Sequence, residues 1–102
     1  MLDYYGSEGK QTKYGNRRMK KFKLAGADWV IKYSPDINDL GRTDPDNCVI
    51  YINTKQSEQG QKLSLAHEIV HAIMFTMGER DHDERFVEGF AQLLYQYEKQ
   101  TV

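Results

Sequence analysis

The sequence predicts an α+β protein in which a small twisted sheet of about three strands, of antiparallel type, packs on two helices. Two observations predict this class. The first half of the chain alternates apolar and charged residues or runs through β-branched and aromatic ones, and the second half spaces its apolar residues as helices do. With 102 residues, of which 39% are hydrophobic, the chain has room for one modest core. We expect a loosely ordered arm over residues 1–17 and a single domain over residues 18–102.

The strands are expected in the first half of this domain. Residues 19–24 alternate apolar and charged side chains, which is the pattern of a strand with one buried face. Residues 29–33 are rich in aromatic and β-branched side chains, so the two segments predict a hairpin. Residues 40–43 are expected as a short extended piece before a turn. Residues 48–53 carry the strongest strand pattern of the chain.

Two helices are expected in the second half. The first starts near residue 61 and is apolar around most of its surface, which places it in the middle of the fold. Gly78 predicts its end, because glycine commonly follows the last residue of a helix. The second runs from about residue 83 to residue 99, with Asp83 as its N-cap. An apolar stripe on the second helix is expected to pack on the first; it consists of Phe86, Val87, Phe90, Ala91 and Leu94.

Composition argues against several classes of protein. The net charge of −1 gives no general attraction to nucleic acid or to acidic membranes. The single cysteine, Cys48, excludes an internal disulfide framework and fits a reducing compartment. Neither a signal-peptide pattern at the N-terminus nor an uncharged run of membrane-spanning length is present. We therefore expect a cytoplasmic protein without a membrane partner.

The first predicted helix contains a His-Glu-x-x-His motif. His67 and His71 are four residues apart, so they lie on one face of the helix and can hold one ion. Glu68 projects about 100° away from His67 and is poorly placed as a ligand, but it can reach a water held by that ion. A zinc ion with two imidazoles and a third protein ligand lowers the pKa of such a water to roughly 7, and Glu68 can take the proton. The alternative is a pair of histidines that are hydrogen-bonded to neighbours without a metal.

The third ligand is expected from the second helix. Glu84 and Glu88 are four residues apart and therefore share a face beside the apolar stripe. One of them would bind the metal and the other would accept a hydrogen bond from a ligand imidazole, because ligand histidines usually donate their free N–H to a carboxylate or carbonyl. His82 and Asp83, in the loop before the helix, are the competing ligands.

The motif and the segment that follows it resemble a known family. Residues 67–71, together with residues 84–94, are similar to the ImmA/IrrE-like branch of the gluzincin metallopeptidases, particularly to the minimal versions common in phages and mobile elements. The similarity extends over roughly residues 20–98, including the turn and strand before the motif.

This resemblance implies a zincin-like metallopeptidase domain with one Zn²⁺ ion. Carried over position by position, it makes His67, His71 and Glu84 the metal ligands and Glu68 the general base. It also implies that Glu88 hydrogen-bonds a ligand histidine.

The expected activity is zinc-dependent hydrolysis of a peptide bond. The partner would be a protein or peptide substrate, for which a repressor is one candidate. If residues 48–53 form an edge strand, the substrate would lie extended along them. The tetrahedral oxyanion needs a donor besides the metal, for which Tyr51, Tyr95 and His82 are the candidates by residue type.

Two other functions compete with this one. The first is a non-catalytic interaction protein of a mobile element that keeps a metal for folding, since a domain of this size gains much from a structural metal. The second is a nucleic-acid-associated protein that uses residues 10–23, which include seven basic residues and no acidic one. Lysines that protect an exposed strand edge explain the same charges, so nucleic acid is the less favoured partner.

Overall fold

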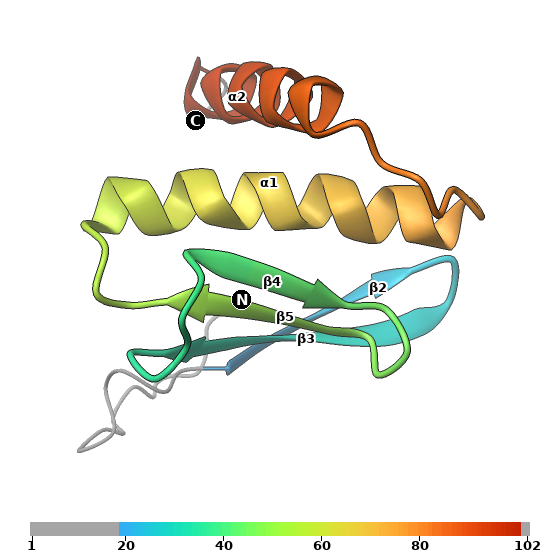
Figure 1. Cartoon of the computed structure of the whole chain (residues 1–102), viewed down its shortest axis with the longest axis horizontal. Helices are drawn as coiled ribbons and strands as arrows, with labels where there is room; N and C mark the ends of the chain where they lie inside the picture. Colours follow the sequence, from blue (N-terminus) through green and yellow to red (C-terminus); the bar gives the residue numbers. More distant parts are fainter. Residues whose placement is uncertain (1–18, 101–102) are drawn as a thin grey trace.

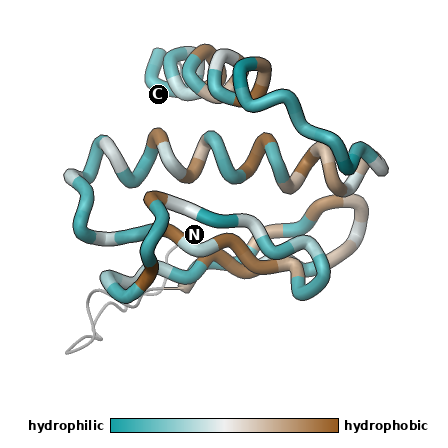
Figure 2. The backbone as a smooth tube through the Cα atoms, in the orientation of Figure 1, coloured by the Kyte–Doolittle hydropathy of each residue, from teal (hydrophilic) through white to brown (hydrophobic). Residues whose placement is uncertain are grey.

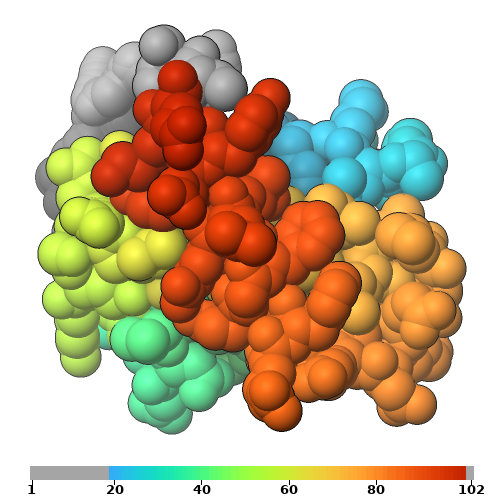
Figure 3. Space-filling model, turned by 90° about the horizontal axis from the view of Figure 1, so that it is seen from above, coloured from blue at the N-terminus to red at the C-terminus, as the bar shows by residue number. Residues whose placement is uncertain are grey.

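The chain folds into three layers, with one helix enclosed between a sheet and a second helix. The computed structural model describes residues 19–100. Helix α1 (Glu58–Thr76) lies over the sheet, and α2 (Glu84–Gln100) lies on the opposite side of α1 (Figure 1). Seen from the α2 side, α2 crosses the middle of the molecule and leaves both ends of α1 visible (Figure 3). The strands of the sheet are β2 (Met19–Leu24), β3 (Ala27–Ser34), β4 (Gly41–Asp44) and β5 (Val49–Asn53).

The predicted α+β class is confirmed, and the sheet differs from the expected one in having a fourth strand and one parallel pair. The sheet has four strands in the order β2-β3-β5-β4, and β3 pairs with β5 in parallel. The hairpin of β2 and β3 is antiparallel, as predicted. The fourth strand is β4, which pairs antiparallel with β5 and forms an edge. Because β5 is buried along nearly its whole length, it takes the centre of the sheet, and the connection over residues 35–48 is long enough for the parallel crossing.

Several element boundaries differ from the predicted ones for local reasons. Helix α1 begins at Glu58 because the Ser57 side chain accepts a hydrogen bond from the Gly60 N–H at 3.0 Å. Strand β5 begins one residue later than predicted, since Cys48 has a left-handed φ of 55°. The Asp83 side chain accepts from the Arg85 N–H at 3.0 Å, as expected of an N-cap. The predicted arm over residues 1–17 lies outside the described residues.

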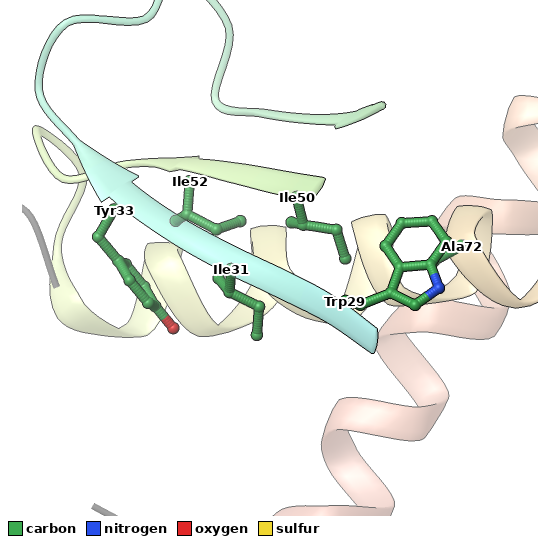
Figure 4. Packing of buried hydrophobic residues seen from close by; sticks show 6 residues of the cluster. All are labelled: Trp29, Ile31, Tyr33, Ile50, Ile52 and Ala72. Atoms are coloured by element: carbon green, nitrogen blue, oxygen red, sulfur yellow. The ribbon is translucent and has the colours of Figure 1, made fainter. Parts of the chain in front are cut away.

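Two apolar clusters hold α1 on both sides, as the apolar surface of its sequence predicts. Between the sheet and α1, the side chains of β3 and β5 pack against Ala72 of α1 (Figure 4). Figure 2 shows that these two strands carry the longest apolar stretch of the sheet. Between α1 and α2, the cluster consists of Ala66, Val70, Val87 and Ala91, with Met74, Leu94 and Tyr95 packed against it.

The expected packing of Phe86 and Phe90 on α1 was wrong. Their exposed fractions are 53% and 49%, and the two rings contact each other with centroids 5.7 Å apart. The face of α2 that meets α1 is centred on Val87 and Ala91, each one residue further along the helix and therefore about 100° around it. The two phenylalanines consequently lie at the border of the interface.

A buried asparagine fixes the loop that leads into β4. The Asn53 side chain is 8% exposed and donates to the carbonyl oxygens of Ile37 and Asp39, at 3.1 and 3.2 Å. Its Oδ1 accepts from the Lys55 N–H at 2.8 Å. Three backbone groups around β4 and β5 are therefore satisfied by one side chain.

We expect Asn53→Ala to lower the free energy of unfolding by about 1–3 kcal/mol, because it leaves buried backbone groups without partners. Chemical denaturation of both proteins measures this difference. Lys55→Ala, a change at an exposed position nearby, is the control and should shift the midpoint little. Equal midpoints for Asn53→Ala and the wild type would show that this network contributes nothing to stability.

No helix within residues 19–100 is both long and apolar enough to cross a membrane.

Candidate metal centre

Helices α1 and α2 bring two histidines and a glutamate together. One potential ligand atom from each of His67, His71 and Glu84 lies within 4.8 Å of the other two. The Glu84 carboxylate faces both rings, with Oε1 at 3.2 Å from His67 Nε2 and Oε2 at 3.4 Å from His71 Nε2. Ligand atoms held by one tetrahedral zinc ion are separated by about 3.3 Å, so these spacings suit such an ion.

The hydrogen bonds around His67 test whether a cation fits there. His67 Nδ1 lies 2.9 Å from Glu88 Oε1, which can only accept, so Nδ1 carries the proton. In the neutral imidazole, Nε2 then has a lone pair that points toward the Glu84 carboxylate. Two acceptors that face each other repel unless a cation lies between them. The donor set therefore fits a divalent metal that accepts imidazole nitrogen and carboxylate oxygen, as zinc does.

The pKa directions of two groups agree with this arrangement. Burial lowers the pKa of His71, with the Glu84 charge opposing it, so its ring is neutral and can act as a ligand at neutral pH. The pKa of Glu88 is lowered, first by the hydrogen bond from Gln92 and then by the one from His67, so it stays an acceptor. Glu88 thus lies beside His67, one of the two histidines that the resemblance implies as metal ligands.

Glu68 is a buried carboxylate beside the three converging residues. It is 8% exposed, and burial raises its pKa, while a hydrogen bond from Thr43 opposes the rise. Thr43 Oγ1 lies 2.7 Å from Glu68 Oε1. The backbone of β4 approaches closely at Gly41, where a Cβ atom would meet Glu68 Cγ at 3.0 Å. Strand β4 therefore fixes the position of the Glu68 carboxylate from one side.

These residues line an open cleft of about 510 Å³, which we call the site cleft. Glu68, His67, His71 and Glu84 form part of its wall. Arg42 and Arg80 line the same cleft, and Arg42 also lies over the ring of Tyr51, 4.8 Å from its centroid. A second cleft, lined by Leu40 and Leu63, shares Gly41, His67 and Glu68 with the first.

The three residues suggested by residue type as oxyanion donors lie in different places relative to the site cleft. Tyr51 alternates with Ile50 and Ile52, which face α1, so its ring faces the other side of the sheet. Tyr95 packs in the cluster between the helices. His82 lines the site cleft, but both its ring nitrogens have partners within residues 19–100.

Sequence reasoning missed the contributions of Thr43, Gly41 and Arg80 to the site. Nothing in the four residues of β4 marks them as neighbours of the motif, because the contact depends on the pairing of β4 with β5. Of the two competing ligands, Asp83 caps α2, as predicted, and His82 lies outside the group of three.

Fold and site together define an α+β domain in which a His-Glu-x-x-His helix and a glutamate from the next helix form a candidate metal centre. The sequence profile of the peptidase family M78, the IrrE N-terminal-like domain, matches residues 29–97, which is more than half of the chain. The chain therefore belongs to this family, and the family expected from its resemblance is confirmed. No match was found among curated proteins, and none among solved structures.

Proposed function

We propose that the protein is a zinc metallopeptidase that cuts a peptide bond in a protein or peptide substrate. The observation that carries this proposal is the convergence of His67, His71 and Glu84 beside a buried Glu68 in an open cleft. Membership of a peptidase family supports it independently. Bound by these three residues, a zinc ion would supply Lewis-acid chemistry, activating a water and polarising the scissile carbonyl.

In the proposed mechanism, Glu68 moves the protons. Its carboxylate takes a proton from the attacking water and gives it to the leaving amine. The raised pKa of Glu68 makes its carboxylate a stronger base toward the attacking water. Thr43 holds one carboxylate oxygen by its hydrogen bond, so the other remains available to the water. The charge of Arg80 in the site cleft would stabilise negative charge on the carbonyl oxygen.

The substrate strand is proposed to pair with β4. The expectation that residues 48–53 receive it was conditional on their being an edge, and β5 is central. Strand β4 is the edge strand next to β5, and the carbonyl of Leu40, the residue before β4, accepts from the Asn53 N–H of β5. By antiparallel alternation, Gly41 and Thr43 direct their N–H and C=O groups away from β5. These groups lie next to Glu68 and can bind an extended backbone.

The openness of the site favours catalysis over a purely structural metal. Structural zinc sites are usually closed by four protein ligands, whereas catalytic sites have three and an open position. Among the described residues, three potential ligands lie close together, and they line a cleft. The alternative of nucleic-acid binding concerns the basic residues within residues 10–23. Lys23 of this segment forms an ion pair with Asp28, and Lys10 to Arg18 lie outside the described residues.

Digestion of a proteome-derived peptide library tests the proposal. We expect the zinc-loaded protein to generate a consistent set of new peptide termini, since the library presents many extended sequences. Treatment with a chelator should abolish these cuts, and added zinc should restore them. Cuts that persist after complete metal removal, or a metal-loaded protein that leaves the library intact, would contradict a zinc peptidase.

A further inference from the structure

We propose that His82 is a positioning residue that holds the ring of His71 in the orientation and tautomer needed for metal binding. This inference rests on the proposed metal centre. Neither the motif nor the group of three ligands assigns a role to His82. The two rings approach through their nitrogens, with His71 Nδ1 and His82 Nδ1 2.6 Å apart.

Only one assignment of protons satisfies the contacts of a neutral His82. Its Nε2 lies 2.7 Å from the Glu79 carbonyl oxygen, which can only accept, so Nε2 carries the proton. Nδ1 of His82 is then an acceptor, and the proton between the rings belongs to His71 Nδ1. It follows that the His71 Nε2 lone pair is free and points toward Glu84. This is the tautomer that a metal ligand requires.

The position of the His82 ring is fixed by packing as well as by hydrogen bonds. The Phe75 ring lies against it, with centroids 4.3 Å apart. The His71 and His82 rings are within 15° of parallel and their centroids are 4.9 Å apart. The distance of 2.6 Å between the two Nδ1 atoms is much shorter than the distance between the ring centres, so the rings approach through their nitrogens rather than through their faces. A ring held in this way limits the rotation of His71 about its side-chain bonds.

The end of α1 explains how the loop reaches this position. Gly78 has a φ of 90°, and the Glu79 N–H donates to the Met74 carbonyl, which is the pattern of a Schellman cap. The cap turns the chain back over the last turn of α1. The Glu79 carbonyl and His82 therefore lie on the same side of the helix as His71.

The two ligand histidines thus have different partners at Nδ1. His67 Nδ1 faces a carboxylate oxygen of Glu88, whereas His71 Nδ1 faces a ring nitrogen of His82. Partners of this kind orient ligand rings, and their loss typically weakens metal binding by about 10–100-fold. Helix spacing predicted an acceptor at either Glu84 or Glu88, and the family resemblance implied that it is Glu88. His82 performs the same task from a loop.

Zinc affinity and imidazole tautomers test the proposal together. The variants are His82→Phe, which keeps an aromatic ring against Phe75 but has no acceptor, and His82→Gln, whose amide can accept from His71 and donate to Glu79. We expect His82→Phe to bind zinc about 10–100-fold more weakly in chelator competition, and His82→Gln to recover most of the loss. Thermal unfolding of the metal-free proteins shows whether each variant is folded.

Long-range ¹H–¹⁵N NMR of the metal-free wild type is the second readout. It should show the proton of His71 on Nδ1 and that of His82 on Nε2, and the His71 preference should weaken in His82→Phe. Wild-type affinity in His82→Phe, or a His71 proton on Nε2, would overturn the role of His82 alone. A wild type that binds no zinc would instead overturn the metal centre, and the positioning role with it.

Discussion

The wild type is expected to hold one zinc ion per chain, and Glu84→Ala is expected to lose it. Glu84 is the only one of the three converging residues that comes from α2, and each of its two carboxylate oxygens faces a different histidine. Its removal leaves two imidazoles, which hold zinc much less tightly than three ligands. Loss of a partner that only orients a ligand already costs about 10–100-fold in affinity, so loss of a ligand should cost more.

Zinc per chain, measured by mass spectrometry after dialysis, checks this expectation. The Glu84 side chain is 67% exposed, so the variant should fold and its metal-free form should unfold near the wild-type temperature. Glu98→Ala is a matched control on the same helix and should keep one zinc per chain. Full retention of zinc in Glu84→Ala would move the third ligand to Glu88 or His82, which contact the two histidines.

The spacing of apolar side chains within single segments predicted those helices and strands in which the apolar pattern is long. The hairpin of β2 and β3, the central place of α1 and the pairing of α1 with α2 all follow from side-chain spacing within one segment. For β4 the sequence predicted only a short extended piece, because Gly-Arg-Thr-Asp has no apolar residue to signal a strand. It becomes one by pairing with β5, and that pairing also decides the strand order. The pairing of two distant segments cannot be predicted from the spacing of side chains within either one of them.

The candidate site likewise contains residues that helix spacing predicts and residues that only contacts between distant segments bring in. His67 and His71 share a helix face by spacing, and Glu84 and Glu88 do so on the next helix, so sequence reasoning could bring these four together. Thr43 reaches Glu68 across 25 positions of the chain, and this contact depends on the edge position of β4. His82 reaches His71 only because the cap at Gly78 turns the chain back over the end of α1. The spacing of residues in the sequence does not reveal this contact.

Glu68→Gln is expected to abolish peptide hydrolysis while keeping the zinc. A glutamine has nearly the same shape and can accept the hydrogen bond from Thr43, so the neighbouring ligands should stay in place. It cannot take a proton from the attacking water. General-base catalysis contributes about 10²–10⁴-fold, which corresponds to roughly 3–5 kcal/mol of the barrier. Cleavage of a peptide identified in the library digest, together with zinc content, measures both effects.

The stability of the variant separates this role from a structural one. Burial raises the pKa of Glu68, so in the metal-free protein the ionised carboxylate is less favourable in the folded state than in the unfolded one. The stability contribution of this group is therefore present at low pH and is lost as the pH rises through the folded-state pKa. A neutral glutamine avoids that loss, so at neutral pH the metal-free variant should unfold at the wild-type temperature or above it.

Three results for Glu68→Gln lead to three different conclusions. Zinc retained with hydrolysis lost, in a protein of undiminished stability, assigns the proton transfer to Glu68. Hydrolysis that continues at the wild-type rate would show that another group is the base. Zinc lost along with hydrolysis would place Glu68 among the metal ligands, which its contact with Thr43 and its direction on α1, about 100° from His67, argue against.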